Sequence, residues 1–225
     1  MNANIQEYFN EFNKFLNDFN KNMTLEYSMM LLSDGKVTIQ ELYEEIIAPS
    51  LNNIIIRRSE EDSKIWKEHI MSNIVRTVIE CAYPFVLKEK EQNKNLHPSK
   101  KVIVICPEDE YHEIGPLIGA DFYTILNYEV FYVGCNTPKE NFISAINTLN
   151  PDIVSISISN PLNLVSLKDI IKTIRNTFSN KVVIVISGSA LLHSNKTTEY
   201  FGADAQVNTY KDIKALREVT DEISI

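Results

Sequence analysis

Hydrophobic and polar positions follow two different periods in the two halves of the chain. Up to about residue 90, apolar side chains recur every three or four positions, which is the spacing of one face of an amphipathic helix. Beyond residue 100, short apolar runs rich in β-branched residues alternate with polar-patterned segments of helical length. The pattern therefore predicts a helical region followed by an α/β domain.

Four helices are predicted in the first half. The second runs from Thr24 to about Ser33, and Thr38-Ile39-Gln40-Glu41 reads as a capping box that opens the third. Pro49 should kink this third helix or reset its start. Ser59-Glu60-Glu61-Asp62 resembles the N-terminal cap of the fourth, whose apolar positions run from Ile65 to Cys81. Four helices with short connections indicate a small bundle.

The first of these helices carries an aromatic stripe. We interpret the stripe as a core face, and the alternative is a surface for a partner or for a second copy. It consists of Tyr8, Phe9, Phe12, Phe15, Leu16 and Phe19.

A charged and polar segment from Lys88 to Lys101, which contains Pro98, interrupts both patterns. Such a change of composition is typical of a domain boundary. We therefore expect a helical bundle cap in residues 1–90, a linker in 91–100 and an α/β domain in 101–225.

The second half predicts a five-stranded parallel sheet of the Rossmann-like, flavodoxin-like kind. Its strands are near-continuous apolar runs, as expected where helices cover both faces of a sheet through right-handed crossovers. The predicted strands are 102–105, 130–133, 153–158, 182–186 and, more weakly, 205–207, and the predicted helices are 114–127, 138–149, 164–178, 194–201 and 211–222.

Composition narrows the classes of function. The 225 residues carry a net charge of −8 without a basic cluster, which disfavours direct nucleic-acid binding. Cys81, Cys106 and Cys135 lie far apart in apolar surroundings, so we expect buried thiols rather than a disulfide framework or a thiolate metal site. The N-terminus lacks a signal pattern, and no apolar run approaches a membrane span. A cytoplasmic protein that does not enter a membrane is expected.

Candidate chemistry lies in the loop after the first predicted strand, where Glu110-x-His112-x-x-Gly115 places a carboxylate two residues from an imidazole. A carboxylate at this spacing can accept one ring N–H and leave the lone pair of the other nitrogen for a metal. By itself the motif is weak, and the alternative is an ordinary loop histidine with an acidic neighbour. Ligands of parallel sheets bind beyond the carboxyl ends of the strands, so the loops after the other strands should share the site. Those loops supply glycine and serine candidates, namely Gly134, Ser157, Ser159, Gly188 and Ser189.

Taken together, residues 99–225 resemble the cobalamin-binding domain family. Glu110-x-His112-x-x-Gly115 matches the family's D/E-x-H-x-x-G motif, and the other matching segments are Tyr132-Val133-Gly134 before Pro138, Ser157, Ser187-Gly188-x-Ala190 and Gly202-Ala203-Asp204. The resemblance implies that His112 is the lower axial ligand of cobalt and that Glu110 holds His112. It also implies that Ser157 bonds the displaced nucleotide tail and that Gly188 leaves the tail room.

In the first half, Ala48-Pro49-Ser50-Leu51 and Glu68-His69 resemble the helical cap that lies over the upper face of the corrin in this superfamily. The pattern is most similar to that of the adenosylcobalamin-dependent photoreceptor regulators. Arg58 stands where that group has a tryptophan, and Trp66 lies at a different helical position. We expect Arg58, Trp66, Glu68 and His69 to lie near the upper face, with His69 as a candidate upper ligand.

The leading hypothesis from the sequence is a cobalamin-binding sensor or regulatory protein that is light-responsive through adenosylcobalamin. Without a DNA-binding segment in view, it would signal through a protein partner or a homo-oligomer formed by the cap. The first alternative is a corrinoid carrier for methyl transfer, with methylcobalamin as its cofactor, and hydroxocobalamin is a further bound form to consider. The second alternative, suggested by Arg58 and Ser187, is a degenerate module that binds no corrin.

Overall fold

The structure is a computed structural model that describes residues 3–51, 65–93, 100–178 and 182–222. The chain divides into two compact units, residues 1–89 and residues 90–225.

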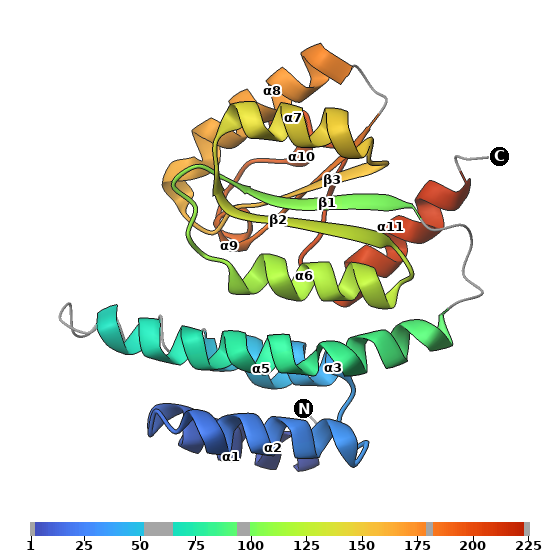
Figure 1. Ribbon diagram of the computed structural model, residues 1–225. Coiled ribbons are helices and arrows are strands. Elements are labelled where there is room, and N and C mark those ends of the chain that lie inside the picture. The colour runs from blue at the N-terminus through green and yellow to red at the C-terminus, as the bar shows by residue number, and fades with distance from the viewer. Residues whose placement is uncertain (1–2, 52–64, 94–99, 179–181, 223–225) are drawn as a thin grey trace. The chain divides into compact units, whose positions relative to one another are not determined.

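The second unit is built on five parallel strands, as the sequence predicts (Figure 1). The order β2-β1-β3-β4-β5 makes β1 and β3 neighbours although their connections leave in opposite directions. In such a sheet the gap between these two strands is the topological switch point, where ligands bind. The strands are β1 (Lys101–Pro107), β2 (Glu129–Thr137), β3 (Ile153–Ser157), β4 (Val183–Ser187) and β5 (Ala205–Gln206).

Helices cover both faces of this sheet. In Figure 1, α7 and α8 lie on one face, and α6 and α11 lie on the other. β1 and β3 are buried along almost their whole length. On one face of the sheet, Ile103 and Ile105 of β1 and Val154 and Ile156 of β3 form a core cluster with apolar side chains of α7 and α8. The helices of this unit are α6 (Ile114–Ile125), α7 (Lys139–Leu149), η2 (Pro161–Asn163), α8 (Leu164–Phe178), α9 (Ser189–Leu192), α10 (Thr198–Phe201) and α11 (Tyr210–Glu222).

One predicted helix of this unit is wrong. Residues 194–201 were expected to form a single helix, whereas the structure has α9 before this segment and α10 only at its end. Thr197 is extended and occupies the N-cap of α10, and Gly202 ends that helix in the left-handed conformation. The polar residues between the two helices offer no apolar face to bury, so the chain forms a turn there.

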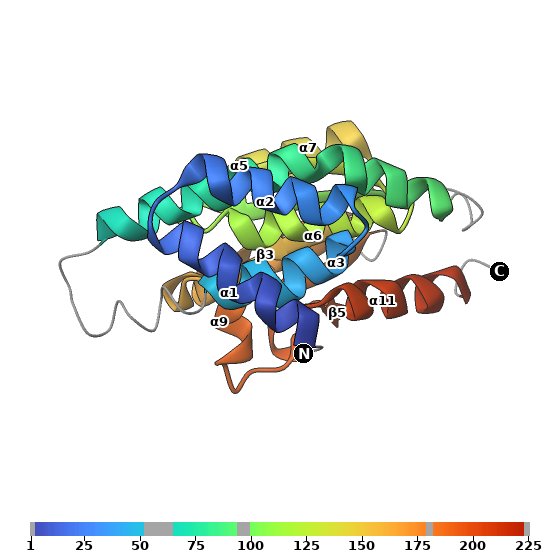
Figure 2. The ribbon, with the colours of Figure 1, turned by 90° about the horizontal axis from the view of Figure 1, so that it is seen from below.

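The first unit consists of helices, as predicted. Figure 2 shows α1 beside α2, and α1 also contacts η1. Within the aromatic stripe of α1, Phe12 and Leu16 are fully buried, and the ring of Phe15 packs edge-on against Tyr27. The stripe is therefore a core face in this structure. The helices are α1 (Ala3–Asn17), α2 (Lys21–Ser33), α3 (Ile39–Glu41), η1 (Leu42–Ile47) and α5 (Ile65–Gln92).

The capping box predicted at Thr38 and Glu41 is present, with both reciprocal hydrogen bonds. The chain remains helical through residue 51 instead of starting anew at Pro49. It widens before the proline into the π-helical turn η1, in which the N–H of Ala48 donates to the carbonyl of Tyr43. A wider turn gives a proline ring room that the tighter α-helical turn would deny it. The cap predicted at residues 59–62 lies outside the described residues.

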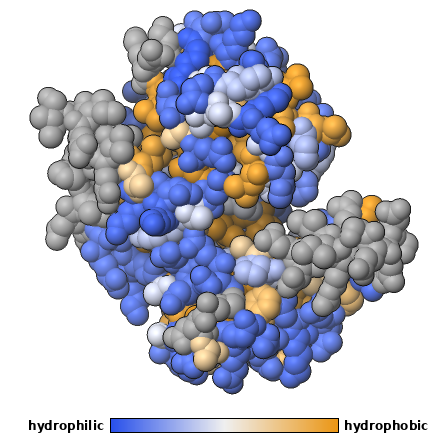
Figure 3. All heavy atoms as spheres, turned by 180° about the vertical axis from the view of Figure 1, so that it is seen from behind, coloured by the Kyte–Doolittle hydropathy of each residue, from blue (hydrophilic) through white to orange (hydrophobic). Residues whose placement is uncertain are grey.

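α5 is the one helix among the described residues that is long and apolar enough to cross a membrane by length and composition. This is weak evidence, because Met71, Ile74, Val78 and other side chains of α5 are buried inside the protein, as in an ordinary core helix. Figure 3 shows a mostly hydrophilic face of the chain with scattered apolar side chains. Such scattering is normal for a protein surface.

The cysteines differ from the sequence expectation. Cys81 is exposed rather than buried, and Cys106 is fully buried in β1. Cys106 and Cys135 are neighbours on adjacent strands, and all three thiols are free.

Candidate functional site

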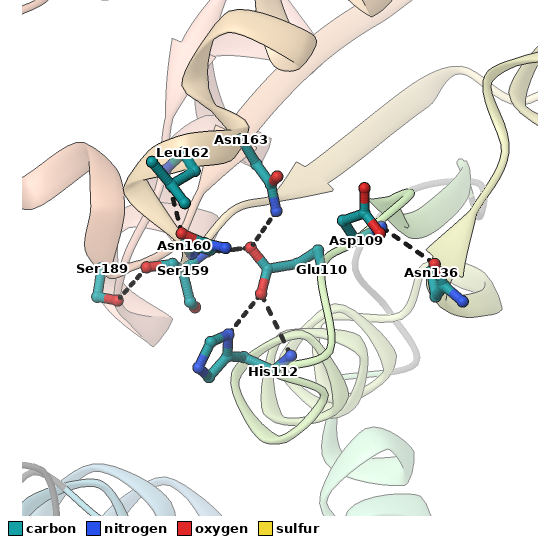
Figure 4. A network of polar contacts seen from close by, with 9 residues as sticks. All are labelled: Asp109, Glu110, His112, Asn136, Ser159, Asn160, Leu162, Asn163 and Ser189. Atoms are coloured by element: carbon teal, nitrogen blue, oxygen red, sulfur yellow. Dashed lines mark hydrogen bonds and ion pairs between the residues drawn. The ribbon is translucent and has the colours of Figure 1, made fainter. Parts of the chain in front are cut away.

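Two loops meet beyond the carboxyl ends of β1 and β3, at the switch point of the sheet. The first follows β1 and leads into α6 at Ile114. The second follows β3 and leads through η2 into α8. Glu110 of the first loop points into the second (Figure 4), so a single side chain connects the two segments.

The carboxylate of Glu110 is almost completely buried and accepts hydrogen bonds on both oxygens. Oε2 accepts the backbone N–H groups of Ser159 at 2.9 Å and Asn160 at 2.8 Å, and the side-chain amide of Asn163 at 3.3 Å. Oε1 accepts the backbone N–H of His112 at 3.2 Å and contacts His112 Nδ1 at 2.5 Å. These donors supply what a buried negative charge requires.

Burial by itself would raise the pKa of Glu110. The hydrogen bonds from the His112 ring and from the backbone N–H groups of Asn160, Ser159 and His112 outweigh that effect and lower the pKa to about 2. Glu110 is therefore a carboxylate at neutral pH, and it acts as a hydrogen-bond acceptor.

The imidazole of His112 is oriented by this carboxylate. Because Nδ1 faces Oε1 of Glu110, the neutral ring carries its proton on Nδ1 and its lone pair on Nε2, a tautomer inferred from the contact. About half of the side chain is exposed (53%). A histidine held in this way presents Nε2 as a basic, directed ligand for a metal.

The carboxyl end of β2 supports the first loop. Asn136 Oδ1 accepts the N–H of Asp109 at 3.0 Å, and the N–H of Asn136 donates to the carbonyl of Glu110 at 2.9 Å. Asp109 and Asn136 both have positive φ angles, 63° and 53°. Aspartate and asparagine tolerate this conformation better than most other residues, and the paired hydrogen bonds hold the two turns together.

The candidate glycines differ in whether the structure requires a residue without a side chain at their positions. Gly188 has a φ of +107°, and a Cβ at this position would lie 2.2 Å from the carbonyl oxygen of Ile158. The close approach of two backbone segments thus already requires glycine at position 188, apart from any room for a ligand. Gly134, with a φ of +101°, lies in β2, whereas a Cβ on Gly115 would meet nothing within 4 Å.

The candidate serines lie at the same edge of the sheet. Ser157 is the buried last residue of β3 and pairs with Ser187 at the end of β4. The hydroxyl of Ser189 donates to the carbonyl of Ser159 at 3.5 Å, and the N–H of Ser159 bonds Glu110. Three of the predicted loops therefore converge near His112.

The candidates in the helical unit lie at the start of α5. Trp66 is 53% exposed, and its ring centroid lies 5.9 Å from that of Phe19. Glu68 is half-buried, and His69 is exposed and accepts the side-chain amide of Asn73 on its backbone carbonyl. Arg58 lies outside the described residues.

Sequence reasoning missed three asparagines of this network, Asn136, Asn160 and Asn163. Asn160 carries the one local signal, because an Asn-Pro pair favours a turn, and its side chain accepts the N–H of Leu162. Asn163 was detectable only as an amide in an apolar neighbourhood, where it is buried.

A fold with a switch-point site of this kind defines a class of small-cofactor-binding α/β domains. The profile of the family described as "B12 binding domain" matches residues 100–213, which is half of the chain. The chain therefore belongs to the B12-binding domain family, and its cofactor class is a cobalamin or related corrinoid. No curated protein matches the sequence at a significant level.

One solved structure agrees with this fold over nearly the whole chain. The monomethylamine corrinoid protein of Methanosarcina barkeri superposes with a TM-score of 0.82 at 17% identity, covering 95% of this chain and 99% of that one. A cobalamin-binding protein of Desulfitobacterium hafniense DCB-2 gives a TM-score of 0.46 at 18% identity, with coverage of 93% and 97%. The methanol:cobalamin methyltransferase complex of M. barkeri gives 0.48 at 16%, with coverage of 96% and 79%. The first match extends the fold likeness to the helical unit, and the scores of the other two are too low to argue from.

Proposed function

We propose that this protein is a corrinoid carrier for methyl transfer, with His112 as the lower axial ligand of cobalt. The observation that carries the proposal is the contact between Glu110 and His112 in a B12-binding domain. The likeness of the whole chain to a monomethylamine corrinoid protein supports the carrier role over the sensor role.

The donor set suits such a cofactor. The chain would hold the cobalt of a corrin through a single directed nitrogen. His112 offers that nitrogen from a half-exposed side chain, and buried Glu110 holds its tautomer. Ser157, Ser159 and Ser189 lie at the same edge of the sheet and would bond polar parts of the cofactor.

The bound cobalt would supply the site that accepts and releases the methyl group. The chain's own contribution is to bind the cofactor, orient its lower ligand and tune that ligand's basicity. Glu110 keeps His112 electron-rich, and the donors from Ser159, Asn160 and Asn163 limit how much negative charge reaches the ring. A methyltransferase would be the protein partner.

The sensor hypothesis is kept as a second candidate because of Glu68 and His69. Both lie in the first turns of α5, and the role of His69 as an upper ligand stays a prediction. Several expectations of the sensor hypothesis stay predictions. They are light sensitivity, the adenosyl form of the cofactor and the roles of Trp66 and Arg58. A cytoplasmic location stays a prediction as well.

The test begins with purified protein mixed with hydroxocobalamin, desalted, and measured by absorption spectroscopy. We expect a retained corrin with a histidine-ligated spectrum, which His112→Ala should abolish. His193→Ala is the matched control, because His193 is also exposed but follows α9. A colourless wild-type protein, or an unchanged spectrum in His112→Ala, would overturn the proposal.

A second measurement separates carrier from sensor. The adenosylcobalamin complex is passed over a size-exclusion column in the dark and after green light. A carrier should elute at the same volume in both states. A light-dependent change of elution volume that His69→Ala removes would instead favour the sensor.

A further inference from the structure

A pair of thiols lies beneath the loop that carries Glu110 and His112. Cys106 is the residue before the end of β1, and its neighbours Ile105 and Pro107 pair with Gly134 and Thr137 of β2. This register, which is shifted between Ile105 and Pro107, leaves Cys135 and Asn136 in the stretch of β2 opposite Cys106, and the side chains of Cys106 and Cys135 interact. Paired strands lie about 4.8 Å apart, which is within the Cα separation that a disulfide can bridge.

The two thiols are chemically unequal. Cys106 is fully buried, whereas Cys135 is only partly buried. A hydrogen bond from the Cys106 thiol to the Cys135 sulfur raises the pKa of Cys106 and lowers that of Cys135, although burial opposes the latter effect.

The hydroxyl of Tyr132 also interacts with the Cys135 sulfur and lowers its pKa. This interaction is loose, because the hydroxyl is buried without a partner of ordinary hydrogen-bond geometry among the described residues. The reactive form of a cysteine is the thiolate. Cys135 is thus the more accessible and more readily ionised member of the pair, and the Cys106 thiol lies next to its sulfur.

We propose that Cys135 and Cys106 form a peroxide-responsive pair that closes into an intramolecular disulfide. The Cys135 thiolate attacks one oxygen of a hydroperoxide and becomes a sulfenic acid, while the other oxygen leaves as water or alcohol after taking up a proton. The Cys106 sulfur then attacks the Cys135 sulfur, the S–O bond breaks, and the hydroxyl leaves as water with the Cys106 proton. Two electrons pass in total from the two thiols to the peroxide.

The disulfide would act on the candidate site through Asn136, the residue after Cys135. Asn136 bonds both Asp109 and the carbonyl of Glu110. Drawing the two sulfurs to about 2.05 Å shifts the backbone on both sides of these bonds and moves the support of His112. This second half of the inference rests on the proposed function, whereas formation of the disulfide does not.

The first experiment uses Cys81→Ser protein without added cobalamin, so that the exposed third thiol cannot link two molecules. After treatment with hydrogen peroxide, both remaining thiols should become unreactive toward a thiol reagent, and peptide mass spectrometry should find Cys106 joined to Cys135. A phosphine reductant should restore both thiols. In a Cys81→Ser, Cys106→Ser variant, Cys135 should stop at a sulfenic acid that dimedone traps.

Persistence of both thiols after peroxide, or a sulfenic acid at Cys135 that never becomes a disulfide when Cys106 is present, would overturn the proposal. The second experiment compares retention of hydroxocobalamin by the reduced and oxidised proteins. Oxidation should weaken binding about 10-fold, as loss of a ligand's supporting contacts typically does. Equal affinities would refute the regulatory half. If the reduced protein binds no cobalamin, the proposed function fails while the disulfide result stands.

Discussion

Replacing Glu110 with glutamine should destabilise the second unit substantially. The folded protein lowers the pKa of this carboxyl from 4.5 to about 2, and each pKa unit corresponds to about 1.4 kcal/mol. The native contacts therefore favour the carboxylate over its neutral acid by about 3 kcal/mol. A neutral amide forfeits this preference and also turns an NH2 group toward buried N–H donors. We expect Glu110→Gln to lower the free energy of unfolding by about 3 kcal/mol at neutral pH.

The assay is urea denaturation followed by circular dichroism, with Glu108→Gln as the control. Glu108 lies in the same loop and is exposed, so its replacement should change stability by less than about 0.5 kcal/mol. Because the folded pKa of Glu110 lies below its unfolded value, its contribution is full above pH 4.5 and is lost as the pH falls toward about 2. Equal stabilities of the two variants at neutral pH would refute this account of the Glu110 contacts.

Three further predictions follow from the packing. Gly188→Ala should lower the free energy of unfolding by more than about 1 kcal/mol, measured by thermal or urea denaturation, because the new Cβ would lie 2.2 Å from a backbone oxygen and the φ angle is +107°. Gly119→Ala is the control: it lies on an open face of α6 and should not be destabilising. Burial raises the pKa of Glu89 above its ordinary value of 4.5, so folding favours the neutral form of this side chain. The wild type should therefore lose stability relative to Glu89→Gln as the pH rises above 4.5, and a constant difference between the urea midpoints of the two proteins would count against this. Asn163→Ala should weaken retention of hydroxocobalamin less than Glu110→Gln does, because it removes one of the five donors, and spectra after desalting give the comparison.

Much of the α/β unit could be predicted from local pattern. The run Val102–Ile105 is β-branched and apolar on both sides, and Ile153–Ile158 interrupts its apolar residues with two serines only. Such runs are typical of the strands of a covered parallel sheet. The segment around α9 and α10 was mispredicted because its helix signals are short and its polar residues fit a turn as well as a helix.

The candidate site was predictable in part, through Glu110 and His112, which are close in sequence. The contact between Glu110 and Asn163 joins residues 53 positions apart, and it depends on where two loops meet after the sheet has formed. Likewise, the meeting of Cys106 and Cys135 depends on bulges in β2 that shift the register. The spacing of residues along the sequence therefore indicates neither the contact between Glu110 and Asn163 nor the one between Cys106 and Cys135.

The only tryptophan of the chain, Trp66, lies in the helical unit beside Phe19. The second unit instead contains the buried edge-to-face ring pair of Tyr123 and Tyr128. Light that excites indole alone therefore makes the fluorescence a reporter of the helical unit. The near-ultraviolet dichroism of buried tyrosines reports on both units, because Tyr43 of the helical unit is buried as well. Transitions of the two signals that coincide in one denaturant titration would indicate that the units unfold together, and separate transitions would indicate that they unfold in sequence.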